Sequence, residues 1–117
     1  MKSLILKHTD SFHAYLIESL RDPKEAMIYL QVALEEYEQD QDAEAFLLAL
    51  RNVAEAHGGL AALAKKIDMN RQHLYRALSS KGNPTLLTLD AILHGLGFRL
   101  SIEPLSKKRK PRRSTDR

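Results

Sequence analysis

The stretch from Gly58 to Leu78 constrains the fold of this chain more than any other part of the sequence. After two glycines it carries apolar residues at the i, i+3, i+4 and i+7 positions of one helical face, the spacing of a buried stripe. These residues are Leu60, Leu63, Ala64 and Ile67. The triplet Asp68-Met69-Asn70 interrupts the period, and Asn70 is a favourable N-cap because its side chain accepts a hydrogen bond from a free backbone amide. The stretch therefore predicts two short helices joined by a tight turn.

The second of these helices has an apolar inner side and a polar, basic outer side. Leu74, Ala77 and Leu78 are expected to face inward. The outward set has no acidic residue and consists of groups that hydrogen-bond phosphates and base edges. It comprises Arg71, Gln72, Tyr75 and Arg76. This arrangement is typical of a helix-turn-helix, whose second helix enters the major groove of DNA.

The turn itself fits the same interpretation with one departure. Ala64 is the small residue that the crossing of the two helices requires, and Ile67 and Met69 are the apolar residues beside the turn. Asp68 stands where glycine is usual, because the backbone there prefers a positive φ, which Asp tolerates better than most residues. A plain helical hairpin in an all-α core is the alternative, and spacing alone does not separate the two.

Further candidate DNA contacts surround this unit, and Asn70 is a candidate phosphate donor as well as a cap. Lys65 and Lys66 lie at the end of the first helix. Lys81 lies in the loop after the second helix, and Asn83 precedes the next helix N-terminus, where anions are favoured. Simple exposure is the alternative for these last four residues, since many surface lysines contact nothing.

Three helices are predicted before the unit. The first runs from about Ser11 to Leu20, after Asp10 as its cap, with an inner stripe of Phe12, Tyr15, Leu16 and Leu20. The second begins at Asp22-Pro23, because Asp caps helices and Pro suits the first helical position. Its apolar face comprises Ala26, Tyr29, Leu30, Ala33, Leu34 and Tyr37. The third is expected over about residues 43–57, before the two glycines.

Beyond the unit the sequence predicts one more helix, a short strand and a disordered tail. Thr85 is expected to cap the helix. The segment Phe98–Glu103 alternates apolar and polar residues, as a strand does. Residues 106–117 contain no apolar side chain that packs in a core and are expected to be disordered. By length the chain is one domain, so the expected fold is a single all-α domain over residues 1–105 with about five to six helices.

Charge is distributed unevenly along the chain. Residues 1–57 carry 5 basic and 11 acidic side chains, residues 58–105 carry 6 and 3, and residues 106–117 carry 7 and 1. Such asymmetry indicates nucleic acid at one end and a different partner at the other. The tail has two interpretations, a solvated charge run or an arm that adds non-specific phosphate contacts.

The residues that catalysis or metal binding would need are missing or scattered. There is no cysteine, and the five histidines form no HExxH pattern. His8, Asp10 and His13 are one candidate metal trio, but helix-entry and loop positions explain them as well. We expect no enzymatic activity, no metal and no cofactor. No apolar run is long enough for a membrane span or a signal peptide, so a cytoplasmic protein is expected.

A resemblance to the Xre/lambda-repressor-like helix-turn-helix domains is carried by GGLAALAKKIDMNRQHLYRALSSKGNPTLLTLDAILHGLGFRLSIEP. The segments LYRALSSKGNPTLLTL and RDPKEAMIYLQVALEE are similar to the bacterial addiction-module antidote proteins, the HigA-like antitoxins. The resemblance covers about residues 9–104. It implies the antitoxin of a type II toxin–antitoxin module, a RelE/ParE-like toxin as operon partner, and autorepression. A stand-alone regulator of the same fold is the alternative.

Two expectations about partners follow. Helix-turn-helix proteins usually dimerise to read half-sites about 34 Å apart, and a second copy could pair with the predicted strand edge. We therefore expect a homodimer. A toxin that acts on nucleic acid is expected to be basic, so the acidic residues 1–57 are the expected toxin-binding part, with Tyr15, Tyr29 or Tyr37 as apolar anchors. The acidic cluster comprises Glu35, Glu36, Glu38, Asp40, Asp42 and Glu44.

Overall fold

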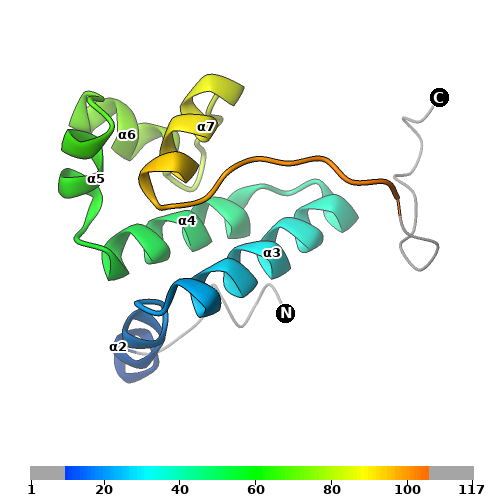
Figure 1. Cartoon of the computed structure of the whole chain (residues 1–117), viewed down its shortest axis with the longest axis horizontal. Coiled ribbons are helices and arrows are strands. Elements are labelled where there is room, and N and C mark those ends of the chain that lie inside the picture. Colours follow the sequence, from blue (N-terminus) through cyan, green and yellow to red (C-terminus); the bar gives the residue numbers. More distant parts are fainter. Residues whose placement is uncertain (1–9, 106–117) are drawn as a thin grey trace.

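The computed structural model describes residues 10–105 of the chain, and this part is all-α, as the sequence predicts. Its six helices are α2 (Asp10–Ser19), α3 (Pro23–Asp40), α4 (Glu44–Ala56), α5 (Leu60–Lys66), α6 (Arg71–Ala77) and α7 (Leu86–Gly95) (Figure 1). No helix in the described range is both long and apolar enough to cross a membrane. The predictions for the basic tail at 106–117 lie outside the described residues.

Helix α4 is the element on which the others pack. Eight of its thirteen residues are buried, and Leu50 and Val53 are 0% exposed. Helices α2 and α3 lie on one side of α4, and α5 lies on the other side with α6 and α7 packed against it (Figure 1). One apolar core runs through both sides, from Leu30 of α3 to Leu74 of α6 and Ile92 of α7. The α5–α6 unit is therefore held by the same core as the N-terminal helices.

The start of α3 follows the sequence prediction. The backbone N–H of Lys24 donates to Asp22 Oδ1 over 2.9 Å, and Pro23 is the first helical residue. Ala26, Leu30 and Ala33 form the buried face. Small alanines at this face let α3 approach α4 closely.

The inner stripe predicted for the first helix is wrong in part. Helix α2 begins at Asp10 itself, Phe12 is 42% exposed and Tyr15 is 72% exposed. Only the end of the stripe reaches the core, through Leu16 and the buried Leu20. The reason lies in how α2 packs on its neighbours. Helix α2, seen nearly end-on in Figure 1, crosses beneath α4 and packs mainly against it. Only part of the predicted stripe therefore contacts apolar surface.

The strand predicted over Phe98–Glu103 does not form. Residues 10–105 contain no β-strand, and the segment after α7 runs as an irregular stretch along the molecule (Figure 1). A strand needs a second strand to complete its hydrogen-bond ladder, and the described part of the chain supplies none. Phe98 packs against the core, whereas Ile102 is 99% exposed.

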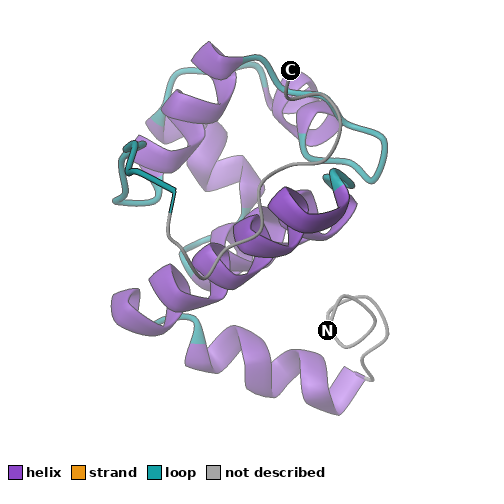
Figure 2. Ribbon diagram, turned by 90° about the vertical axis from the view of Figure 1, so that its right-hand side faces the viewer, coloured by secondary structure: helices purple, strands orange, loops and turns teal. Residues whose placement is uncertain are grey.

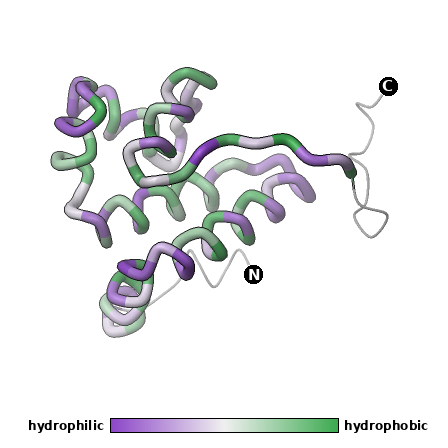
Figure 3. The backbone as a smooth tube through the Cα atoms, viewed as in Figure 1, coloured by the Kyte–Doolittle hydropathy of each residue, from purple (hydrophilic) through white to green (hydrophobic). Residues whose placement is uncertain are grey.

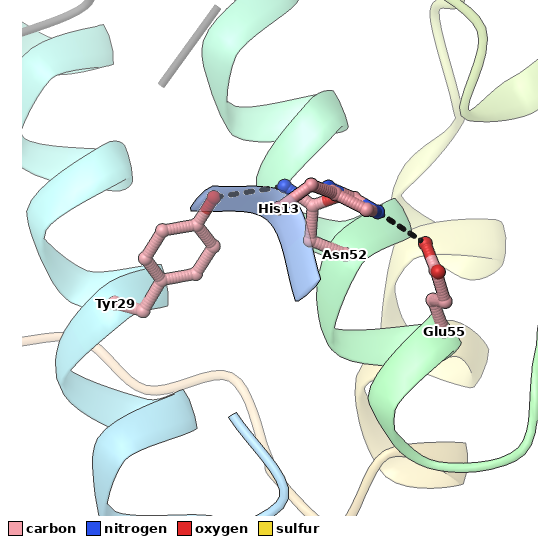
Figure 4. A network of polar contacts seen from close by, with 4 residues as sticks. All are labelled: His13, Tyr29, Asn52 and Glu55. Atoms are coloured by element: carbon pink, nitrogen blue, oxygen red, sulfur yellow. Dashed lines mark hydrogen bonds and ion pairs between the residues drawn. The ribbon is translucent and has the colours of Figure 1, made fainter. Parts of the chain in front are cut away.

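Polar contacts join α4 to the helices on both of its sides. Asn52 is the one buried polar residue of the described chain, and its amide donates to the Tyr29 hydroxyl of α3 over 2.9 Å (Figure 4). The neighbouring Arg51 donates from its guanidinium to the Leu78 carbonyl at the end of α6. His13 Nε2 of α2 lies 3.0 Å from Glu55 Oε1 of α4 (Figure 4). These contacts orient the helices where apolar packing alone would allow sliding.

We expect Tyr29→Phe to lower the free energy of unfolding by about 1–3 kcal/mol, because the buried Asn52 amide loses its acceptor. Burial also raises the pKa of Tyr29, against a smaller lowering by the Asn52 hydrogen bond. A raised folded-state pKa means that stability is lost as pH rises above the unfolded value of about 10. Urea unfolding at neutral pH and above pH 10 measures both effects.

The matched control is Tyr15→Phe, which removes a hydroxyl that is largely exposed. At neutral pH, Tyr15→Phe should leave the free energy of unfolding nearly unchanged. Above about pH 10 it should lose stability as the wild type does, whereas Tyr29→Phe should lose less because the Tyr29 hydroxyl is absent. Equal stability of the two variants at neutral pH would contradict a structural role for the Asn52–Tyr29 contact.

Candidate nucleic-acid interface

The turn between α5 and α6 has the geometry that the sequence predicts. Asp68 adopts a φ of 55°, the left-handed conformation expected at this position. Asn70 caps α6, because its Oδ1 accepts from the backbone N–H of His73 over 2.9 Å. The N–H of Met69 donates to the carbonyl of Ala64 over 2.9 Å, which ends α5. The two short helices are therefore fixed at a defined angle by local hydrogen bonds.

The two sides of α6 are also as predicted. Leu74 and Ala77 are buried, and Leu78 directly after the helix is buried as well. The expected outward residues Arg71, Gln72, Tyr75 and Arg76 are all exposed. The guanidinium of Arg71 lies 6.0 Å from the centre of the Tyr75 ring, at the limit of a cation–π contact. Helix α6 carries no acidic residue, so its outer face is polar, aromatic and positively charged.

A hollow lies between α6, the following loop and the start of α7. It is lined by His73, Arg76, Ala77, Ser79, Lys81, Gly82, Asn83, Pro84, Thr85 and Thr88. The lining includes two cations and no carboxylate. The N-terminus of α7 opens into it, where Thr85 Oγ1 accepts from the backbone N–H of Thr88 over 3.2 Å. Basic side chains beside a helix N-terminus suit an anion such as a phosphate.

Gly82 gives the loop its close approach to α6. A Cβ at this position would collide with the backbone carbonyl of Ala77. The N–H of Gly82 also donates to the carbonyl of Ser79 over 2.9 Å. Because the loop folds back so tightly, it brings Lys81 and Asn83 to the hollow beside Arg76.

The structure brings together some of the predicted contact residues and separates others. Lys81 and Asn83 are exposed and line the hollow with Arg76. Lys65 and Lys66 are exposed on the last turn of α5 and do not line it. In that place their charge also complements the negative end of the helix dipole, which is a structural role.

Two residues beyond the predicted contact set also belong to this surface. His73 is exposed and lines the hollow from α6, and Thr88 lines it from α7. The spacing gives a signal for both, since His73 lies three residues before Arg76 and Thr88 three residues after Thr85. Residues three apart on a helix share a face.

Charge differs between the two sides of α4. The helices α5–α7 are at the top of Figures 1 and 2, and α2 is at the bottom, with α3 and α4 between them. Helix α3 carries five acidic side chains and one basic side chain, whereas α5 and α6 carry four cations and no acid. Residues 10–105 contain no group of three His, Asp or Glu side chains that could hold a metal ion, and His8 of the candidate trio lies outside the described residues.

These features define an all-helical protein with one basic surface suited to a polyanion and one acidic side. A family model described as "Probable addiction module antidote protein" matches residues 9–104. Over 86 residues the chain is 31% identical to an uncharacterized protein of Haemophilus influenzae, an alignment that covers 74% of this chain and 84% of that relative. No solved structure matches the chain. The chain belongs to the addiction-module antidote family, which confirms that part of the resemblance and implies a toxin as partner.

Proposed function

We propose that this protein is the antitoxin of a type II toxin–antitoxin module in the bacterial cytoplasm, and that it represses its own operon by binding DNA. Family membership supports the antitoxin half of the proposal. The outer face of α6, polar and basic without an acid, carries the DNA-binding half. In this proposal the α5–α6 unit is a helix-turn-helix of the Xre/lambda-repressor type, as in HigA-like antitoxins.

The proposed DNA contacts divide into two kinds. Arg71 and Gln72, on the first turn of α6, read base edges, because an Arg fork matches guanine and a Gln amide matches adenine. Tyr75 and Arg76 extend this contact along the groove. The hollow with Lys81 and Asn83 takes a backbone phosphate, and phosphate contacts fix register without reading sequence. Further phosphate contacts come from Asn70 and from Lys65 and Lys66.

We expect Arg71→Ala and Gln72→Ala each to weaken binding to the DNA upstream of the gene by about 1–3 kcal/mol and to relax specificity at one position. Titration of each variant against that DNA measures the effect. Arg21→Ala is the control, since it removes an exposed cation from the turn between α2 and α3. Unchanged affinity in both α6 variants would remove this helix from the groove.

We also propose that the protein acts as a homodimer, because a single helix-turn-helix contacts one half-site only. The segment Phe98–Glu103 supports this proposal, since it carries no strand partner within the described chain and exposes Leu100 and Ile102. A second copy related by a two-fold axis would supply the missing ladder. Sedimentation at tens of micromolar is expected to show a dimer, and a monomer would argue against this assembly.

The alternative is a stand-alone regulator of the same fold, and a test of the neighbouring gene separates the two. We expect the small protein encoded beside this gene, proposed to be RelE/ParE-like, to arrest growth when expressed alone. Co-expression of the antitoxin should restore growth, and the two proteins should co-purify, because burial of the toxin surface blocks its activity. A protein that binds the upstream DNA but no neighbouring gene product would instead be the stand-alone regulator.

A further inference from the structure

Helix α3 is apolar on more than its buried side. Its inner face of Ala26, Leu30 and Ala33 is covered by α4. Four further large apolar side chains are 38–46% exposed, namely Met27, Ile28, Val32 and Leu34. Leu34 was expected inside, and the structure corrects this. A helix at the surface of a globular protein normally carries polar residues opposite its buried stripe, and exposed apolar patches mark interaction sites.

These side chains form one surface on the helix. Ile28 and Val32 are neighbours at i, i+4 on one flank, and Met27 and Leu34 lie two turns apart on the other flank. Gln31 and Glu35 project between the two flanks and are exposed. We call this surface, Met27, Ile28, Gln31, Val32, Leu34 and Glu35, the outer face of α3. It spans about two helical turns, the length that helix-in-groove recognition uses.

The charge of α3 indicates which kind of partner protein would bind this face. The helix has one basic side chain and five acidic ones, which are Glu25, Glu35, Glu36, Glu38 and Asp40. Figure 3 shows the hydrophilic residues gathered at its C-terminal end. A two-fold contact between copies would place the same acidic helix against itself, and opposed like charges are unfavourable. A partner with basic residues around an apolar groove complements the face.

We propose that the outer face of α3 is the docking surface for the toxin, an inference that rests on the proposed antitoxin function. The partner it fits is a protein with an aliphatic or aromatic groove rimmed by Lys and Arg. Ile28 and Val32 are the anchors of this contact. Because Asp22 caps α3 and α4 supports it, the helix is ordered before binding, which reduces the entropy lost in the complex.

The position of this face leaves the DNA surface open. Helix α4 lies between α3 and the α5–α6 unit (Figure 1). A toxin bound to the outer face of α3 therefore does not cover Arg71 or Gln72 on α6. The same protein molecule can therefore hold toxin and operator together.

The test compares full-length variants for binding to the purified product of the neighbouring gene by calorimetric titration. Ile28→Arg and Val32→Arg put a cation where an apolar anchor meets a basic rim, and each is expected to weaken binding at least about 30-fold. Ile28→Ala removes the anchor without adding charge and is expected to give a smaller loss in the same direction. Leu105→Arg is the control, because it places the same cation on an aliphatic position that is 72% exposed and outside both α3 and the segment Phe98–Glu103.

Operator binding by each variant reports whether the fold and the α6 surface are intact. The proposal is supported if the α3 variants lose toxin binding, Leu105→Arg keeps it, and all of them bind operator as the wild type does. Toxin binding that survives both Ile28→Arg and Val32→Arg overturns it, and loss of self-association in those variants would then assign the face to a second copy. A neighbouring protein that does not bind even the wild type overturns the antitoxin assignment itself, which is a distinct result.

Discussion

Burial of α4 on two sides is the constraint on which the rest of this structure depends. Its apolar residues Leu50 and Val53 contribute to a core shared by the N-terminal helices and the α5–α6 unit, and full burial of such a side chain stabilises by about 1.5–3 kcal/mol. Two adjacent residues then extend in different directions, Arg51 to the end of α6 and Asn52 to Tyr29 of α3. Since α4 holds both neighbours, the orientation of α6 relative to α3 is a property of this one helix.

Charged side chains are also distributed differently on the two sides of α4. Burial lowers the pKa of Arg51, and the charge of Glu44 opposes that shift. The Arg51 guanidinium lies between α4 and the end of α6, where it donates to the Leu78 carbonyl. The cations of α5 and α6 are instead exposed to solvent. Helix α4 lies between these cations and the acidic side chains of α3. In the proposed function, DNA and toxin bind to different parts of the surface, one basic and one acidic.

Local features of this fold are readable from the sequence, and features that depend on a neighbour are not. The caps at Asp22 and Asn70 follow from short-range hydrogen bonding, and the outward residues of α6 follow from helical period alone. The exposure of Tyr15 in α2 depends on how α2 crosses α4, which no periodicity encodes. The hollow is lined by residues from α6, a loop and α7. The sequence does not show which residues these are, because they come together only where the loop at Gly82 folds back against α6.

The left-handed residue in the turn has a consequence for how such proteins are recognised. Asp68 adopts a φ of 55°, a conformation that is less favourable for a residue with a Cβ than for glycine. Its side chain is exposed, so it occupies no space in the core. A sequence motif that requires glycine at this position would not match this chain. A single nucleotide change can convert a Gly codon into an Asp codon, so such chains can arise easily. Grouping Gly, Asn and Asp by their shared tolerance of this backbone shape, rather than by side-chain chemistry, would recover sequences of this kind.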